Sequence, residues 1–115
     1  MTDKLPEPDK TERIQEANDR LRKHLIGGRV LITIGVQGLE DETRNRVVNA
    51  IRDFDDFSKD NDPYREHDFG SVKVDGETYF FKIDAYDKSL EYGSPDPSDP
   101  EVTERVMTIL RADEY

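Results

Sequence analysis

Cysteine is absent from this sequence of 115 residues, and so is any apolar run close to the length of a membrane span. Without cysteine the chain can form neither disulfide bonds nor thiolate metal sites. A membrane-spanning helix needs about 20 apolar residues, and the polar start MTDKLPEPDK lacks the apolar core of a signal peptide. We therefore expect a soluble, cytoplasmic protein that does not interact with membranes.

Hydrophobic residues are also scarce, at 33% of the chain against 38% charged residues. They are clustered rather than diluted, which favours a small folded core over disorder. A chain of this length forms one domain that buries roughly two thirds of the surface exposed by the unfolded chain. Pro6 and Pro8 lie in the first eight residues, so we expect residues 1–8 to be a flexible tail and residues 9–115 to form a single α+β domain.

Positive charge is in short supply as well. The chain has 17 Lys and Arg residues against 27 Asp and Glu residues, a formal net charge of −10. Residues 1–29 are nearly balanced, with seven basic and six acidic side chains, so the excess of acids lies in residues 30–115. Such a surface repels the phosphates of nucleic acids and attracts basic proteins. We expect a basic protein partner and no direct binding of nucleic acid.

Two helices are predicted in the first half of the chain. The first has a capping-box-like start, with Asp9 three positions before Glu12, and it stops at the glycine pair 27–28. Its apolar stripe has helical spacing and consists of Ile14, Ala17, Leu21 and Leu25. The second helix follows the acidic residues 40–42, and its apolar face consists of Val47, Val48, Ala50, Ile51, Phe54 and Phe57.

Three strands and a third helix complete the predicted order α-β-α-β-β-α. Residues 29–35 have apolar side chains at both odd and even positions, which is typical of a strand buried on both sides. Asp75-Gly76 separates SVKV from ETYFFKID and predicts a β-hairpin with a two-residue type I′ turn. Residues 98–100 (SDP) are typical of a helix start, and Val102, Val106, Ile109 and Leu110 follow on one side. We expect a three-stranded, mainly antiparallel sheet with helices packed on it.

The hairpin turn fixes which residues face each other, because paired residue numbers must sum to 151. One face is then apolar, should be covered by the first and last helices, and contains Val72, Val74, Tyr79, Phe81, Ile83 and Ala85. The other face contains Phe69, Ser71, Lys73, Phe80, Lys82, Asp84 and Tyr86. If pairing continues past Gly70, His67 lies opposite Asp84, whose carboxylate would orient the imidazole ring.

His67, Lys82, Asp84 and Tyr86 would then form a candidate catalytic or ligand-binding group. Asp–His pairs at the open end of a hairpin are more often structural than catalytic, and no nucleophile accompanies this pair. The alternative hypothesis is a small enzyme or ligand-binding domain in which Asp84 orients His67 to activate water.

The carboxylates around His67 do not match a known metal-binding pattern. An EF-hand loop starting at Asp56 would place Asn61 where glycine is required and His67 where the bidentate glutamate belongs. A zinc site would need further ligands, and His24, the only other histidine, ends a different predicted helix. A loose contact of Mg²⁺ or Ca²⁺ with the loop carboxylates is not favoured over their solvation. We predict no metal and no cofactor.

The acidic residues of the second half form the candidate partner-binding surface, namely Asp53, Asp55, Asp56, Asp60, Asp62, Glu66, Asp68, Asp87, Glu91 and Asp96. If these acids lie along one ridge, they could mimic DNA phosphates, as small anti-restriction or anti-CRISPR inhibitors do. The simpler interpretation is an ordinary acidic surface. Residues 91–100 add three prolines, which make either a rigid connector or an acidic recognition loop.

Several long motifs resemble a known family. They are FDDF, DNDPYREHDFG, KIDAYD, EYGSPDPSDP and the ending VTERVMTILRADEY, and they are similar to those of the proteins grouped as domain of unknown function 3768. The resemblance implies a small bacterial protein. It assigns no activity and no catalytic residue, so the leading hypothesis remains a non-enzymatic interaction protein or inhibitor.

Overall fold

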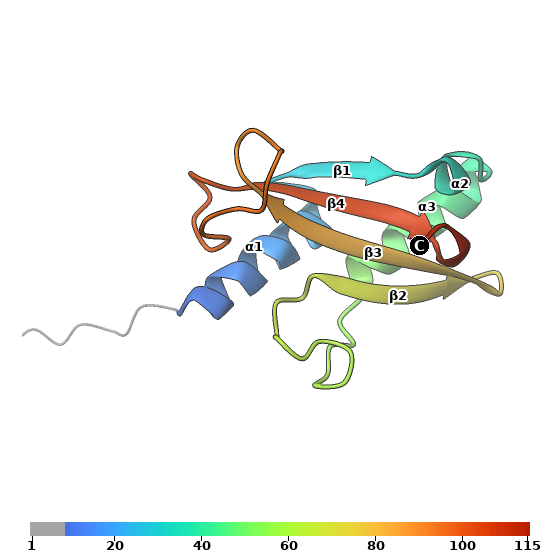
Figure 1. Cartoon of the computed structure of the whole chain (residues 1–115). Helices are drawn as coiled ribbons and strands as arrows, with labels where there is room; N and C mark the ends of the chain where they lie inside the picture. Colours follow the sequence, from blue (N-terminus) through green and yellow to red (C-terminus); the bar gives the residue numbers. More distant parts are fainter. Residues whose placement is uncertain (1–8) are drawn as a thin grey trace, which may run out of the picture.

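The order of the secondary structure elements differs from the predicted order at the C-terminal end. The computed structural model describes residues 9–115, so the predicted flexible tail of residues 1–8 lies outside the described residues. The elements are α1 (Lys10–His24), β1 (Arg29–Ile32), α2 (Ile34–Gln37), α3 (Asp41–Asp53), β2 (Phe69–Val74), β3 (Glu77–Tyr86), β4 (Glu104–Arg111) and the 3₁₀ helix η1 (Ala112–Glu114). Together they form an α+β domain (Figure 1).

The four strands form one mixed sheet in the order β1-β4-β3-β2. Strand β3 is antiparallel to both β2 and β4, whereas β1 pairs with β4 in parallel. Helices α1 and α3 lie on one face of the sheet (Figure 1), where Leu21, Val47 and Ile51 belong to the buried core. On the opposite face, the ring of Tyr115 contacts Phe69 and Phe80, with centroids 6.0 and 5.5 Å away.

The segment predicted to be the C-terminal helix is strand β4. Asp99 does not cap a helix; its carboxylate accepts a hydrogen bond from the backbone N–H of Glu101 at 2.9 Å and so closes a turn. From Glu104 the chain is extended, and the apolar residues of β4 are buried on both faces of the sheet. A strand buried on both faces has a nearly continuous apolar run, which also satisfies helical spacing. The predicted three-stranded sheet and the third helix are therefore wrong.

Strand β1 is shorter and more exposed than predicted. It ends at Ile32, and the following residues form the short helix α2. Because β4 takes the inner position, β1 is an edge strand, and its Val30 and Leu31 are 37% and 53% exposed. The predicted strand buried on both sides through residue 35 is therefore wrong.

The predicted start of α1 is confirmed. The Asp9 carboxylate accepts a hydrogen bond from the backbone N–H of Glu12 at 2.8 Å, which satisfies one of the free donors of the first turn. The helix ends at His24, and the C-cap residue Leu25 follows with a φ of 57° in the left-handed region, two residues before Gly27 at φ 92°. This end places Arg22 in the last turn of the helix.

The β2–β3 hairpin has the predicted turn and register. Asp75 and Gly76 have φ angles of 53° and 80°, as a type I′ turn requires. Val72 pairs with Tyr79, and Gly70 pairs with Phe81. A Cβ at Gly70 would lie 2.6 Å from the ring of Phe81, so only glycine fits here.

The apolar face of this hairpin forms the core, as predicted. Tyr79 and Phe81 are fully buried, and Ile83 and Val74 are nearly so. The helices that cover this face are α1 and α3, not α1 and a C-terminal helix as predicted. The loop between α3 and β2 is consequently held between the core and α1.

Candidate functional site

The loop of residues 54–68, called the 54–68 loop below, joins α3 to β2 and holds most of the predicted site. Two phenylalanines anchor its start to the core. The rings of Phe54 and Phe57 make edge contacts with Phe81, with centroids 5.5 and 6.4 Å away, and they contact each other at 4.9 Å. In the FDDF motif two partly buried rings therefore flank two exposed carboxylates, those of Asp55 and Asp56.

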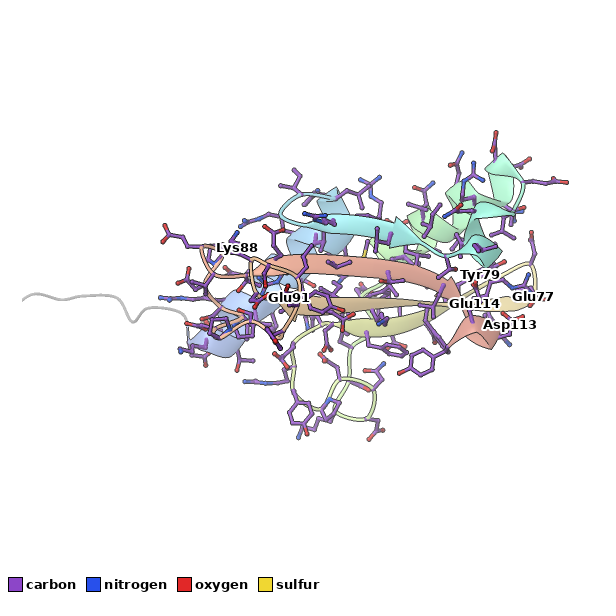
Figure 2. All side chains as sticks on the ribbon, turned by 45° about the horizontal axis from the view of Figure 1, so that its top comes forward. Glu77, Tyr79, Lys88, Glu91, Asp113 and Glu114 are labelled. Atoms are coloured by element: carbon purple, nitrogen blue, oxygen red, sulfur yellow. The ribbon has the colours of Figure 1, made fainter. Side chains whose placement is uncertain are left out.

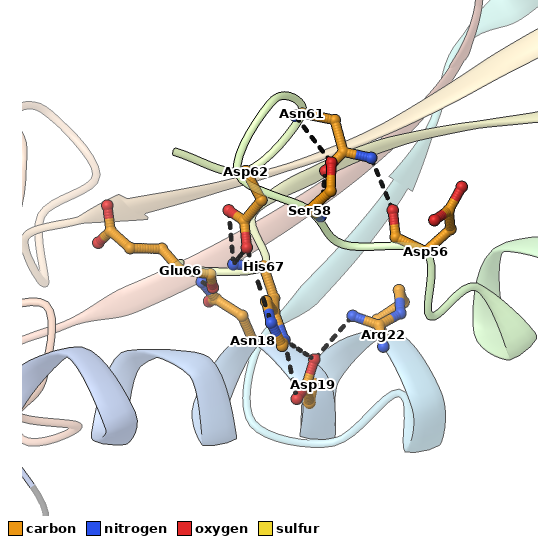
Figure 3. A network of polar contacts seen from close by, with 9 residues as sticks. All are labelled: Asn18, Asp19, Arg22, Asp56, Ser58, Asn61, Asp62, Glu66 and His67. Carbon is orange, nitrogen blue, oxygen red and sulfur yellow. Dashed lines mark hydrogen bonds and ion pairs between the residues drawn. The ribbon is translucent and has the colours of Figure 1, made fainter. Parts of the chain in front are cut away.

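The middle of the loop is closed by Asn61 (Figure 3). Its side-chain oxygen accepts a hydrogen bond from the backbone N–H of Ser58 at 2.7 Å. Its side-chain nitrogen donates to the backbone carbonyl of Asp56 at 2.6 Å. Asparagine side chains commonly close turns in this way, so Asn61 fixes the backbone between residues 56 and 61.

The end of the loop is held by the carboxylate of Asp62, which is 5% exposed. This carboxylate accepts a hydrogen bond from the backbone N–H of His67 at 3.2 Å, and it lies 3.6 Å from Nε2 of the same residue. Arg65 and His67 both have left-handed backbones, at φ 57° and 56°. The Asp62 carboxylate therefore stabilises a chain reversal that few non-glycine residues adopt.

The reversal at His67 removes it from the position predicted by the hairpin register. The last ladder contact on this side runs from the backbone N–H of Ile83 to the carbonyl of Asp68, at 2.8 Å. The His67 ring turns toward α1, where Nδ1 lies 3.0 Å from the Asp19 carboxylate. Asp84 instead forms an ion pair with Lys82 at 3.0 Å. The predicted pairing of His67 with Asp84 is wrong, because strand pairing does not extend past Asp68.

The imidazole of His67 also stacks on an aromatic ring. Its centroid lies 4.0 Å from that of Phe57, and the two planes differ by 5°. Asp19, which contacts His67, accepts a second hydrogen bond from Arg22 at 2.9 Å. His67 is thus fixed by one ring and by the carboxylates of Asp19 and Asp62, one at each ring nitrogen.

Three buried polar residues in this network were missed by the sequence analysis. Asn18 donates to the backbone carbonyl of Glu66 at 2.9 Å and accepts from Nε of Arg105 at 2.8 Å, so it joins the loop to β4. Arg22 is 1% exposed and lies over the rings of Phe57 and Phe81, 5.1 and 5.6 Å from their centroids. Asn18 and Arg22 follow Ile14 at intervals of four, so their helical spacing was the available signal.

Two acids beside this network are partly buried, and burial changes their titration. Burial raises the pKa of Glu66, and the neighbouring carboxylates of Asp68 and Asp62 raise it further. Burial also raises the pKa of Asp68, with smaller contributions from Asp62 and Asp84 in the same direction. The carboxylates around residue 68 therefore repel one another where the loop enters the sheet.

The ten predicted partner-binding acids do not form one uniform surface. Asp53, Asp55, Asp56, Asp60 and Glu91 are exposed, whereas Asp62 is buried and Glu66 and Asp68 are partly buried. Asp87 and Asp96 organise their own loops by accepting hydrogen bonds from Ser89 and Ser98. The 54–68 loop therefore has three exposed acids, namely Asp55, Asp56 and Asp60.

The 54–68 loop also exposes an aromatic side chain that the sequence analysis did not single out. Tyr64 is 78% exposed, and its neighbours Pro63 and Arg65 are exposed as well. The loop whose backbone Asn61 and Asp62 hold therefore presents one large aromatic side chain to the solvent.

Within residues 9–115, no group of three or more His, Cys, Asp or Glu side chains is arranged to hold a metal ion. No helix in that range has the length and apolar character that a bilayer crossing requires.

Residues 32–114 match the family model described as protein of unknown function (DUF3768). No curated protein matches the chain, and neither does any solved structure.

Proposed function

The chain belongs to the DUF3768 family of proteins of unknown function, and we propose that it is a non-enzymatic interaction protein that binds a basic protein through the 54–68 loop. The observation that supports this proposal is that the inward and the outward side chains of the loop have different roles. Those that point inward fix its backbone, and those that point outward form an acidic and aromatic surface.

The inward side chains make the loop rigid before any partner binds. Asn61 and Asp62 hold the backbone, Phe57 and His67 stack on each other, and Asn18 ties the loop to β4. A binding loop that is already ordered loses little conformational entropy on association. Rigidity therefore supports a recognition role for what the loop exposes.

The outward side chains combine an aromatic residue with uncompensated acids. Tyrosine is enriched among the residues that dominate binding energies, and Tyr64 is the most exposed aromatic side chain of the loop. Asp55, Asp56 and Asp60 have no cationic partner among residues 9–115. Unpaired acids attract a basic partner and raise its association rate, and this attraction is screened by salt.

The alternative of an enzyme centred on His67 and Asp84 has less support. A general base needs a ring nitrogen directed at its substrate, and both nitrogens of His67 face carboxylates of the protein. Asp84 lies in an ion pair with Lys82, and Tyr86 pairs across the sheet with Glu104. We therefore place the function in the exposed surface of the loop.

Phosphate mimicry is the special case in which the partner normally binds DNA. It would depend on the exposed acids alone, since Asp62 is buried and Asp87 and Asp96 hold their own loops. Competition between this protein and duplex DNA for the captured partner would identify that case.

The test is affinity capture with matched variants. We expect the wild-type protein to retain a basic protein from a bacterial lysate and to release it as the salt concentration rises. A triple variant with Asp55→Asn, Asp56→Asn and Asp60→Asn should lose the same protein. The control variant Glu12→Gln, Glu16→Gln and Glu101→Gln removes three charges from exposed positions elsewhere and should retain it. Equal retention by both triple variants would refute the proposal.

A further inference from the structure

A cleft of about 410 Å³ lies between α1, the start of β1 and the loop that follows β3. Four cationic side chains line it, namely Arg20, Arg29, Lys88 and Arg105, whereas Glu104 is its one acidic side chain. The chain as a whole has a formal charge of −10. A local excess of three positive charges is therefore contrary to the general composition of the surface, and we call this feature the basic cleft.

The backbone geometry brings these cations together. A Cβ at Gly28 would lie 2.6 Å from the backbone oxygen of Arg105, so glycine allows the chain before β1 to pack against β4. Arg29 then begins β1 opposite Val106. Lys88 comes from the loop after β3, where the Asp87 carboxylate accepts hydrogen bonds from Ser89 and from the backbone of Glu91. Figure 2 shows Lys88 and Glu91 in this loop.

The donors of Arg105 are only partly used by the protein. Its side chain is 4% exposed, Nε donates to Asn18 at 2.8 Å, and Nη2 donates to the carbonyl of Pro97. Its Nη1 has no acceptor within residues 9–115, although the residue lines the basic cleft. This Nη1 is not enclosed by protein, so it can donate to solvent or to an anion in the cleft.

Two of the three exposed cations of the cleft share one carboxylate. Glu104 lies 3.3 Å from Nζ of Lys88 and 4.0 Å from Nε of Arg29. Arg20 has no carboxylate partner in the described part of the chain. One carboxylate cannot neutralise three cations, so the cleft retains donors and positive charge for an external anion.

We propose that the basic cleft binds the phosphate group of a small molecule. A phosphate has several oxygens and accepts from guanidinium and ammonium donors at once, which fits a site built from arginine and lysine. The volume of the cleft exceeds that of a bare phosphate and lies within the range of small-molecule sites. Glu66, near the end of the 54–68 loop, interacts with the Arg105 guanidinium and opposes an anion there, whereas acids more than about 8 Å away are largely screened at physiological salt.

The test uses the full chain and three probes at constant ionic strength, namely inorganic phosphate, glycerol 3-phosphate and adenosine monophosphate. Binding is followed by NMR through the backbone amides of Gly27, Gly28, Arg29 and Lys88. We expect saturable shifts confined to these amides and their neighbours, with a Kd of about 1 mM or tighter for at least one probe. Tighter binding of a monoester than of inorganic phosphate would assign the site to a phosphorylated metabolite, and the reverse would assign it to free phosphate.

Variants make the result specific to the cleft. Arg29→Gln and Lys88→Gln should each weaken binding about tenfold, because each removes a charged donor. Glu104→Gln should strengthen binding several-fold, because it removes the competing carboxylate. Lys73→Gln removes the same charge from an exposed position on the hairpin and should leave binding unchanged.

Two results would overturn the proposal. One is the absence of saturable shifts for all three probes up to about 20 mM, which is far above the affinity expected of a real site. The other is an equal loss of binding in Lys73→Gln and Lys88→Gln, which would show attraction to general positive charge. Arg29 and Lys88 are largely exposed, so their variants are expected to fold, and a thermal melt of each checks this.

Discussion

His67 stacks face to face on Phe57, with ring centroids 4.0 Å apart and planes within 5° of each other. The two residues come from opposite ends of the 54–68 loop, so this contact closes the loop on itself. Asp19 of α1 then joins the closed loop to the helix through Nδ1 of His67. The histidine of the DNDPYREHDFG motif thus joins the two ends of the loop to a helix that lies more than forty residues earlier in the chain.

His67→Ala should destabilise the protein by about 1–3 kcal/mol, because it removes a stacked ring and a hydrogen bond to a charged group. Urea denaturation measures the change in the free energy of unfolding. A double-mutant cycle gives the sharper result: His67→Ala should couple to Asp19→Asn and be additive with Asp84→Asn, since contacting residues couple and distant ones do not. Coupling to Asp84 instead of Asp19 would restore the pairing predicted from the hairpin register.

The hairpin register was predicted correctly, whereas the partner of His67 was predicted as Asp84 and is Asp19. This difference shows which features the local sequence determines. The turn at Asp75-Gly76 needs two residues with positive φ, and this requirement, together with strict alternation, determines the register of Phe69–Val74. The positive φ of His67 has no such local signature. It depends on a buried Asp62 carboxylate and on α1, which lies more than forty residues earlier in the chain.

Strand β4 could not be assigned from the sequence for a related reason. Its apolar run, from Val106 to Leu110, fits one side of a helix and both sides of a strand. The choice is made by pairing with β3 on one side and with β1 on the other, and β1 lies about seventy residues away. Long-range pairing of this kind overrides local propensity. The strand predicted at residues 29–35 to be buried on both sides is, in its observed part β1, an edge strand.

Phe81→Ala should lower the free energy of unfolding by about 3–5 kcal/mol, because the ring is fully buried and contacts Phe54 and Phe57. Chemical denaturation of the variant provides the measurement. Phe80→Ala on the opposite face, where the ring is only partly buried, is the matched control and should cost less. A loss below about 1 kcal/mol for Phe81→Ala would place this ring outside the core.

Asp68→Asn should stabilise the protein at neutral pH. Burial raises the pKa of Asp68 above the value of about 3.9 expected in the unfolded chain, so the charged form is penalised in the folded state. This penalty is fully present above the folded pKa and disappears as the pH falls below the unfolded value. The stability difference between variant and wild type should therefore be positive at pH 7 and shrink toward acid pH. Asp60→Asn, at an exposed position, should show no such trend.

Glu114→Gln should have the opposite pH dependence. The Glu114 carboxylate accepts hydrogen bonds from Oγ1 of Thr33 at 2.6 Å and from the backbone N–H groups of Gly35 and Arg111 at 2.9 and 2.8 Å. These donors, Thr33 first, lower the pKa of Glu114. Its stabilisation is therefore present above the unfolded value of about 4.3 and lost as the pH falls through the folded pKa. The melting temperature of Glu114→Gln should lie below that of the wild type at pH 7 and approach it in acid.

Tyr64→Ala should separate binding from folding. The side chain is 78% exposed, so its removal should change the free energy of unfolding by no more than about 0.5 kcal/mol. The same change should weaken the binding of the proposed basic partner by tenfold or more, because exposed tyrosines on rigid loops often supply a large share of binding energy.

Tyr92→Ala, which truncates another exposed tyrosine outside the 54–68 loop, is the control for a general aromatic contribution. Calorimetric titration at two salt concentrations measures both contributions: charge reversal at Asp55, Asp56 and Asp60 should abolish detectable binding, whereas Tyr64→Ala should weaken binding and leave its salt dependence unchanged. If Tyr92→Ala weakens the binding of the partner and Tyr64→Ala does not, the binding surface lies on the loop after β3 and not on the 54–68 loop.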